Sequence, residues 1–221
     1  MISYLAGMPR SGSTLLASLL NQNPDVFVSS SSPLCNTLYH SERLWSEQVA
    51  LEANPNPVGV NTVLRSIIPA FYANRNESLI VDKAFTWGTP DNLANLVRFA
   101  PNEPKFIVMD RDRSEVRASL ERLMANNPSA RLSSPDQMLR RCEASFNNLT
   151  KAMPENCVVV HYDELVSDTA TVLHRIYSFF GMPDYEHQLT DIRNSSSDDD
   201  GVWGVSQMHE VRPEIRKLAY V

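Results

Sequence analysis

Five short apolar runs, spread along the chain, constrain its fold more than any other feature of the sequence. They lie at residues 2–7, 26–30, 78–82, 105–110 and 157–162. Each run is continuous rather than alternating and is rich in β-branched residues, which is typical of strands buried on both faces. Helical patterns separate the runs, so the sequence predicts an α/β fold with a central parallel sheet of about five strands flanked by helices.

Capping signals at three helix starts support this alternation. They are Thr89 before Pro90, Ser134 before Pro135 with Gln137 three residues after the serine, and Asp112 with Glu115 three residues later. The chain has 221 residues, of which 43% are hydrophobic. That is enough to bury one core, so we expect a single domain over residues 1–221.

A glycine-containing segment, GMPRSGST at residues 7–14, joins the first apolar run to an apolar helix over residues 13–21. Gly12 lets the backbone approach a ligand, the amides from Arg10 to Thr14 can converge on anionic oxygens, and the helix directs its positive end toward them. This arrangement predicts a three-layer, P-loop NTPase-like fold with a phosphate site. The binding residues would be Arg10, Ser11, Gly12, Ser13 and Thr14.

The lysine of a nucleotide-binding Walker A loop is missing from this segment. That motif reads G-x-x-x-x-G-K-[ST], and its lysine reaches the phosphates while its hydroxyl holds Mg²⁺. Here Ser13 stands at the lysine position, and the cation of the loop is Arg10. A magnesium-dependent nucleotide kinase or NTPase stays open as an alternative, because Asp110 and Asp82 each end an apolar run as a Walker B aspartate does.

Three cations follow three different predicted strands. Arg10, Lys83 and Arg111 come directly after or near the ends of their apolar runs. Parallel sheets bind ligands outside the carboxyl ends of their strands, so we expect these side chains to gather at one edge. The net charge of −6 argues against broad nucleic-acid binding. An anionic ligand must therefore meet a local cluster of cations.

Three segments resemble the P-loop sulfotransferases, which use 3′-phosphoadenylyl sulfate. GMPRSGSTLLASLLNQNP, from residue 7, resembles their 5′-phosphosulfate loop, and its PRSG is closer to the tyrosylprotein and bacterial carbohydrate branches. RDRSEVRASL is similar to the segment whose arginine and serine bind the 3′-phosphate, here Arg111 and Ser119. VVVHYDELVSDTATVLHRIYSFFGMP, from residue 158, resembles a strand-to-helix segment in which Tyr162 would line the adenine pocket.

The resemblance implies an enzyme that moves a sulfuryl group in-line from this donor to a hydroxyl or amine acceptor, without a metal. Arg10 would offset charge on the departing 5′-phosphate, an electrostatic stabilisation of the transition state. Lys83, in LIVDKAFTWG, matches a lysine that reaches the transferred sulfuryl group, although Phe85 stands where that family has proline. Arg10 and Lys83 are thus the expected catalytic residues.

The group that accepts the acceptor's proton stays open. The tyrosylprotein branch has a glutamate shortly after its second strand, where this chain reads SSSSPLCN over residues 29–36. That absence keeps a catalytically inactive nucleotide-binding relative as a further alternative. The candidate bases are His40, Glu42 and His209, with Arg212 as a further contact in the site.

The acceptor, a small molecule, a carbohydrate or a peptide, has no single signature. We expect the segments 29–48 and 53–77 to form its wall, with the aromatic side chains of Tyr39, Trp45 and Phe71. A homodimer would be compatible with the sequence. The polar run NSSSDDDG at residues 194–201 predicts a mobile loop.

Location is also an expectation from composition. The apolar run after Met1 is too short to span a membrane, and it lacks the basic leader and cleavage site of a signal peptide. The three cysteines, Cys35, Cys142 and Cys157, have no C-x-x-C spacing, so neither a disulfide framework nor a zinc site is predicted. We expect a cytoplasmic protein with reduced thiols, without a membrane partner.

Overall fold

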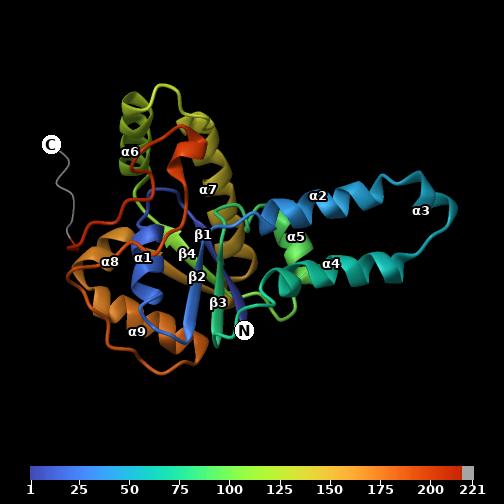
Figure 1. Cartoon of the computed structure of the whole chain (residues 1–221), viewed down its shortest axis with the longest axis horizontal. Helices are drawn as coiled ribbons and strands as arrows, with labels where there is room; N and C mark the ends of the chain where they lie inside the picture. Colours follow the sequence, from blue (N-terminus) through green and yellow to red (C-terminus); the bar gives the residue numbers. More distant parts are fainter. Residues whose placement is uncertain (216–221) are drawn as a thin grey trace.

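The computed structural model describes residues 1–215 and contains a five-stranded sheet in the order β2-β3-β1-β4-β5 (Figure 1). All neighbouring strands are parallel. The strands are β1 Ile2–Gly7, β2 Val26–Ser31, β3 Leu79–Lys83, β4 Phe106–Asp110 and β5 Cys157–His161. Each predicted run matches one strand to within one residue at either end, which confirms the predicted α/β architecture. Because β1 lies between β3 and β4, the loop after β1 opens at the point where the strand order reverses, the usual ligand position in such sheets.

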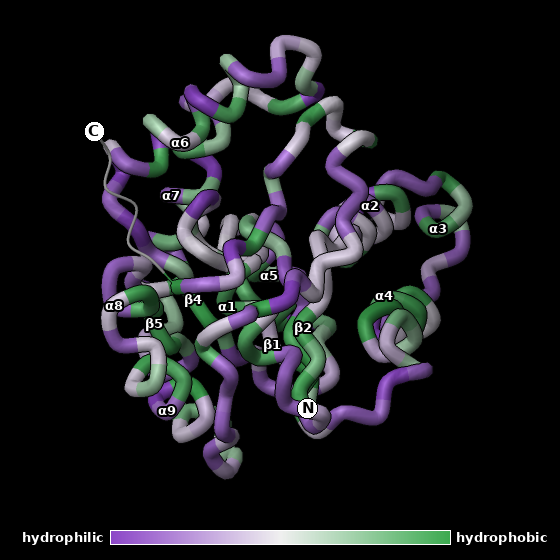
Figure 2. Tube along the Cα trace, turned by 60° about the vertical axis from the view of Figure 1, so that its left-hand side comes forward, coloured by the Kyte–Doolittle hydropathy of each residue, from purple (hydrophilic) through white to green (hydrophobic). Residues whose placement is uncertain are grey.

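Helices cover both faces of the sheet. One face packs against α1 Ser13–Leu20, α8 Tyr162–Ser167 and α9 Thr169–Phe180. The other face packs against α2 Leu34–Ser46, α4 Pro57–Phe71, α5 Pro90–Phe99 and α7 Pro135–Ala152. Figure 2 shows that the strands between these layers are mostly hydrophobic. Burying apolar strands on both sides in this way is the main favourable contribution to folding.

Two further parts complete the fold. Helix α6 Arg113–Asn126 packs beside α7 over the carboxyl end of β1, around the buried side chain of Met8. Helix α3 Val49–Ala53 connects α2 to α4, and these three form a helical hairpin that extends away from the sheet (Figure 1). The short 3₁₀ helices are η1 Pro154–Asn156 and η2 Asp200–Trp203. No helix in residues 1–215 is long and apolar enough to cross a membrane.

The predicted helix starts are confirmed. The Asp112 carboxylate accepts the backbone N–H groups of Ser114 and Glu115 at the start of α6. The Ser134 hydroxyl accepts the N–H of Gln137 at the start of α7. Helix α5 begins at Pro90, whose missing N–H costs nothing in the first turn.

Asp82, in β3, links three other segments of the fold by hydrogen bonds. Its fully buried carboxylate accepts hydrogen bonds from the Trp87 indole at 2.7 Å, from the Tyr72 hydroxyl at 2.6 Å and from Ser32. Burial raises the pKa of Asp82, and the three hydrogen bonds oppose that rise. Asp82 therefore ties β3 to the end of β2, to the residue after α4 and to the loop after β3.

Candidate functional site

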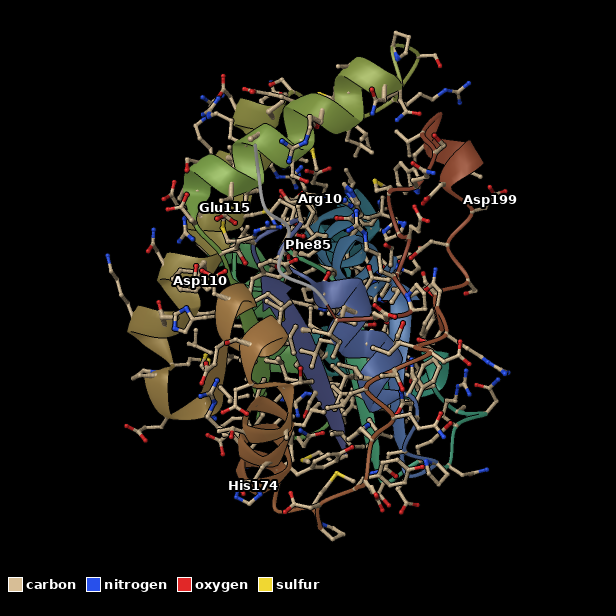
Figure 3. The ribbon with its side chains drawn as sticks, turned by 90° about the vertical axis from the view of Figure 1, so that its left-hand side faces the viewer. Arg10, Phe85, Asp110, Glu115, His174 and Asp199 are labelled. Carbon is tan, nitrogen blue, oxygen red and sulfur yellow. The ribbon has the colours of Figure 1, made fainter. Side chains whose placement is uncertain are left out.

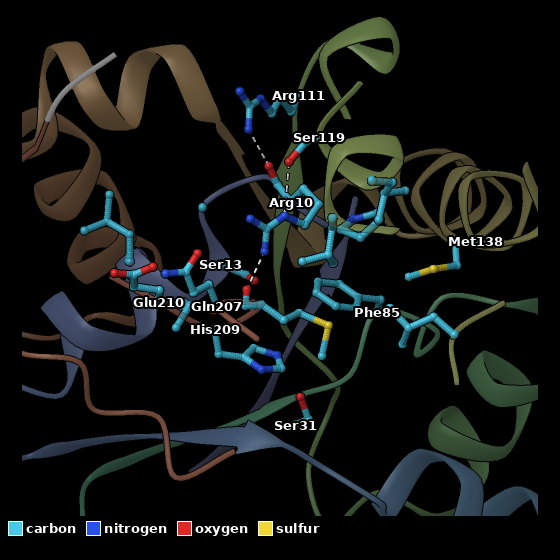
Figure 4. A pocket seen from close by; sticks show the side chains of 18 of the residues that line it. Arg10, Ser13, Ser31, Phe85, Arg111, Ser119, Met138, Gln207, His209 and Glu210 are labelled. Carbon is cyan, nitrogen blue, oxygen red and sulfur yellow. Dashed lines mark hydrogen bonds between the residues drawn. The ribbon is translucent and has the colours of Figure 1, made fainter. Parts of the chain in front are cut away.

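A cleft of about 740 Å³ opens at the carboxyl ends of the central strands. Of the nine residues predicted to bind or act on the donor, eight line it, and Figure 4 shows Arg10, Ser13, Arg111 and Ser119 among them. These eight are Arg10, Gly12, Ser13, Thr14, Lys83, Arg111, Ser119 and Tyr162. The sheet edge thus brings together side chains that lie more than 150 residues apart in the sequence, from Arg10 to Tyr162.

Two glycines give the loop after β1 its path. Gly7 has φ 110°, and a Cβ there would lie 2.2 Å from the Met109 carbonyl oxygen, so the backbones of β1 and β4 require glycine where the loop begins. Gly12 has φ 84°, and a Cβ there would lie 2.9 Å from the Tyr162 ring. Both positions combine a left-handed backbone with a close neighbour, which only glycine satisfies without strain.

Ser11 differs from the prediction in how its side chain is used. The residue is fully buried, and its hydroxyl donates to the Met8 carbonyl. It is not among the residues that line the cleft. The Ser11 hydroxyl therefore holds the loop in shape, which leaves only its backbone amide for the predicted binding role.

The amino end of α1 faces the cleft without a side-chain cap. Gly12 occupies the N-cap position and makes no side-chain hydrogen bond, and the first turn of α1 contains no acidic residue. Ser13 and Thr14, the first residues of the helix, line the cleft. A helix end with these properties is suited to receive the oxygens of an anion.

Arg10 has an unusual backbone for a residue other than glycine. Its φ is 56°, in the left-handed region. Its Nε donates to the Ser119 hydroxyl at 3.2 Å, and its guanidinium also donates to the Met208 carbonyl (Figure 4). The strained turn directs the Arg10 carbonyl toward Arg111, whose Nη1 donates to it at 2.6 Å.

Arg111 is held from three sides. Its Nε and Nη2 each lie 3.0 Å from Glu115 Oε2, one turn further along the chain. Its guanidinium lies 3.9 Å from the centre of the Tyr162 ring. With the bond to the Arg10 carbonyl, these contacts fix the plane of a forked cation that matches phosphate geometry. Tyr162 therefore positions Arg111 in addition to lining the cleft.

The two predicted phosphate subsites touch each other. The sequence assigns Arg10 to the 5′-phosphate and assigns Arg111 with Ser119 to the 3′-phosphate. In the structure Arg10 Nε contacts Ser119, and Arg111 contacts the Arg10 backbone. Arg10 in the loop after β1, Arg111 after β4 and Ser119 of α6 thus form one connected cationic wall, which sequence spacing could not reveal.

Lys83 lies at the end of β3, on the other side of β1 from Arg111. Its side chain is 2% exposed, and its Nζ is 3.9 Å from Asp198 Oδ2. Burial lowers the pKa of Lys83, and the charges of Asp198 and Asp200 oppose that change. A lysine that is buried, lines a cleft and retains a counter-charge is preorganised to meet an anionic group.

The partner of Lys83 comes from a segment here named the C-terminal strap, residues 194–212. The polar run predicted as a mobile loop is irregular in structure before η2, and its hydrogen bonds fasten it along the ends of α1 and β2. Ser195 N–H donates to the Ser18 hydroxyl at 3.1 Å, and Ser31 N–H donates to the Asp198 carboxylate at 3.1 and 3.2 Å. The mobility itself stays a prediction.

His209 sits where the strap enters the cleft. Its Nδ1 lies 2.6 Å from Asp200 Oδ1, and its Nε2 lies 3.6 Å from Asp198 Oδ2. Although burial raises the pKa of Asp198, the hydrogen bond from Ser196 and the charges of His209 and Lys83 outweigh it, so the pKa is lowered overall. Lys83, Asp198, His209 and Asp200 therefore form a chain of alternating basic and acidic groups.

The cleft is strongly cationic for a chain with net charge −6. Among the described residues, seven lysine or arginine side chains line it, against two carboxylates. The cations are Arg10, Lys83, Arg111, Arg122, Arg131, Arg141 and Arg212, and the carboxylates are Glu210 and Glu214. This local excess is the cluster that the overall charge leads us to expect for an anionic ligand.

Several candidates fall outside the cleft lining. His40 and Glu42 lie on α2, and neither lines the cleft formed by the described residues. The same holds for Tyr39 and Trp45 on α2 and for Phe71 at the end of α4. The part of these three side chains in an acceptor wall stays a prediction. Of the three candidate bases, His209 lies in the cleft, as does Arg212.

The two aspartates of the kinase alternative are engaged elsewhere. Asp82 is saturated by the three donors described above. Asp110 pairs with Arg113 and lies 3.0 Å from His161 Nδ1, on the outer side of β4. Neither carboxylate lines the cleft.

Sequence reasoning missed Asp198 and Asp200. Both lie in the low-complexity run, whose composition indicates only a solvated loop. The signal in the sequence was that three consecutive aspartates, residues 198–200, lie about ten residues before His209, in a chain whose other predicted site residues include three cations. No spacing rule connects them to Lys83, because that contact depends on the path of the strap.

Comparison with known proteins agrees with this geometry. The sequence model of the Sulfotransferase family matches residues 4–187. Protein-tyrosine sulfotransferase 1 of Danio rerio is 25% identical over 203 residues, which cover 81% of this chain and 53% of that protein. The chain thus spans about half the length of this curated relative.

Solved structures agree in fold. The sulfotransferase domain from the Synechococcus PCC 7002 olefin synthase has a TM-score of 0.59 at 23% identity, covering 84% of this chain and 74% of that domain. A sulfotransferase from Alicyclobacillus acidocaldarius has a TM-score of 0.57 at 15% identity, covering 85% of this chain and 84% of that one. Together with the glycine loop and the cation-lined cleft, the family match over residues 4–187 establishes that this chain belongs to the sulfotransferase family.

Proposed function

We propose that this chain is a single-domain sulfotransferase that moves a sulfuryl group from 3′-phosphoadenylyl sulfate to a hydroxyl or amine acceptor, in-line and without a metal. The observation that carries the proposal is the convergence of Arg10, Lys83 and Arg111 on one cleft around a glycine loop that lacks the Walker lysine. Fixed cations at these points can supply the positive charge that a kinase obtains in part from Mg²⁺.

The donor would be held at both of its phosphates. The amides from Gly12 to Thr14 and the uncapped end of α1 suit the 5′-phosphate. Arg111 and Ser119 suit the 3′-phosphate, which would replace the present bond between Arg10 and Ser119. That exchange would let the Arg10 side chain contact the 5′-phosphate. Binding of one donor molecule would therefore position both Arg10 and Arg111.

The transfer step balances without a further reactant. A lone pair of the acceptor oxygen or nitrogen attacks sulfur, the acceptor's proton passes to a base in the site, and the bond between sulfur and the bridging oxygen breaks. The electron pair of that bond leaves on the 5′-phosphate, giving adenosine 3′,5′-bisphosphate. Arg10 would stabilise the charge that develops on this phosphate, and Lys83 would stabilise the oxygens of the sulfuryl group during its transfer.

The acceptor would enter over the outer part of the cleft. Phe85, Met138 and Trp203 line it beyond the cationic wall. These side chains offer apolar surface beside hydroxyl and amide groups, which suits a small molecule, a carbohydrate or a peptide side chain. This surface is the proposed acceptor wall.

Adenosine 3′,5′-bisphosphate is expected to bind at least about tenfold more tightly than AMP, because each charge-assisted bond to the 3′-phosphate contributes about 1.5–3 kcal/mol. Isothermal titration of both nucleotides measures the ratio. In Arg111→Ala the ratio should fall toward one, whereas Arg98→Ala, on α5 outside the cleft, should keep it. Equal affinity of the unaltered chain for both nucleotides would refute the proposed donor site.

A further inference from the structure

His209 has the setting of an acid–base residue. Its side chain is 11% exposed, and Figure 4 shows its ring between Arg10 and Ser31. Asp200 Oδ1 lies 2.6 Å from Nδ1, while Asp200 Oδ2 accepts the backbone N–H groups of Met208 and His209 at 2.8 and 3.1 Å. One carboxylate therefore fixes both the ring and its backbone. The pairing keeps the proton of the neutral ring on Nδ1 and leaves the lone pair on Nε2.

The side of the ring that carries Nε2 faces the proposed reaction centre. Nε2 lies 3.6 Å from Asp198 Oδ2, beyond hydrogen-bond distance, and that same oxygen lies 3.9 Å from Lys83 Nζ. Asp198 itself is a poor proton acceptor, because its pKa is lowered and the Ser31 N–H and Ser196 hydroxyl already donate to it. Nε2 is thus the basic atom next to the lysine that would hold the sulfuryl group.

We propose that His209 is the general base of the transfer and that Asp200 is its positioning residue. This proposal rests on the proposed function. As the acceptor oxygen attacks sulfur, its O–H bond breaks and the proton moves to Nε2, while the electron pair of the broken sulfur–oxygen bond leaves on the 5′-phosphate. The imidazolium that forms is stabilised by Asp200 and Asp198, and it later returns the proton to water.

Two phenols of different acidity test the base directly. Phenol keeps its proton in neutral buffer, whereas 4-nitrophenol is already ionised in mildly alkaline buffer. Transfer to phenol is expected to fall about 10²–10⁴-fold in His209→Gln, the usual contribution of a positioned base. Transfer to 4-nitrophenolate, which has no proton to lose, should change much less. An equal loss with both probes, or no loss with phenol, overturns the proposal.

The chain offers a matched control. His174, on α9, also pairs with an aspartate, its Nδ1 lying 2.8 Å from Asp184 Oδ2, but both side chains are exposed, and His174 lies at the far end of the molecule from Arg10 (Figure 3). His174→Gln should leave transfer to both phenols unchanged. The melting temperature of each variant reports whether it is folded.

Asp200→Asn separates positioning from a structural role. The charged groups around His209 are Asp198, Asp200 and Lys83, with Arg10 bonded to the carbonyl of the preceding residue. A carboxylate beside the ring stabilises the imidazolium that forms as the proton moves, so its removal should lower kcat for phenol while transfer to 4-nitrophenolate changes much less. A merely structural role would lower transfer to both phenols equally, and that result would overturn the assignment of Asp200.

Failure of this inference and failure of the proposed function look different. If the unaltered chain binds the bisphosphate and transfers sulfuryl groups, yet His209→Gln transfers to phenol as fast, only the base assignment is wrong. If the unaltered chain does not bind the bisphosphate in calorimetry, the proposed function is wrong, and the base assignment falls with it.

Discussion

Lys83→Met is expected to lower kcat for sulfuryl transfer by about 10²–10³, the usual cost of removing one preorganised donor from an oxyanion-type site. Lys83 lines the cleft at the end of β3 with its side chain 2% exposed. Its proposed target gains charge and changes geometry only as the sulfuryl group leaves. An interaction made mainly in the transition state appears in kcat rather than in binding, so the affinity for the bisphosphate should change little.

Arg111→Ala should give the opposite pattern. The 3′-phosphate takes no part in bond breaking, so it is held equally in the ground state and in the transition state. Loss of Arg111 should therefore raise KM for the donor and weaken the bisphosphate, with a smaller effect on kcat. Steady-state kinetics with titration of the product nucleotide separates the two variants.

Two controls make the Lys83 result specific. Lys105→Met removes a lysine at the amino end of β4, where its Nζ donates to the Phe179 carbonyl, and it should leave kcat unchanged. Lys83→Met also leaves Asp198 without its cation, so the double variant Lys83→Met with Asp198→Asn removes both charges. Recovery of kcat in the double variant, or full kcat in Lys83→Met alone, would contradict a catalytic role for Lys83.

Asp82→Ala is expected to lower the free energy of unfolding by about 3–5 kcal/mol. The indole N–H of Trp87 and the hydroxyl of Tyr72 would lose their acceptor in a buried site, at about 1–3 kcal/mol for each unsatisfied group, and a small cavity would add to that cost. For a chain of this size the melting temperature should fall by about 10 °C or more. Denaturant titration and thermal unfolding measure both values.

The controls for Asp82 separate its charge from its hydrogen bonds. Asp82→Asn keeps one acceptor oxygen and should cost less stability than Asp82→Ala.

Because burial raises the pKa of Asp82 above the unfolded value of about 3.9, the stability that the wild type gains from the protonated group is lost as pH rises above about 4. Asp110→Ala, at the partly exposed end of β4, should cost at most about 1 kcal/mol. Equal losses for Asp82→Ala and Asp110→Ala would contradict this account of Asp82.

The layers of the fold could be predicted because they follow from local patterns. The continuous apolar runs identify the strands, and Asp112 and Ser134 mark helix starts through hydrogen bonds made within one turn. The hairpin of α2, α3 and α4 could not be oriented in the same way. Its direction depends on how the base of α2 packs on α4 and α5, which no local pattern records.

The site residues that lie at or just after the end of a strand could be predicted from the sequence. Arg10, Lys83 and Arg111 follow three neighbouring strands, so parallel topology alone brings them to one edge. Contacts between distant segments were not predictable. The bond from Arg10 to Met208, and the approach of Asp198 to Lys83, depend on the C-terminal strap, whose polar composition carries no periodic signal.

The most direct test of the central claim follows label from donor to acceptor. The protein is incubated in EDTA with 3′-phosphoadenylyl [³⁵S]sulfate and phenol, 4-nitrophenol or a tyrosine peptide, and in parallel with γ-labelled ATP and Mg²⁺. We expect sulfur label on an acceptor, with equal yield when Mg²⁺ replaces the chelator, and no transfer of label from ATP. Transfer of phosphoryl label that requires Mg²⁺, without any transfer of sulfur label, would contradict the account.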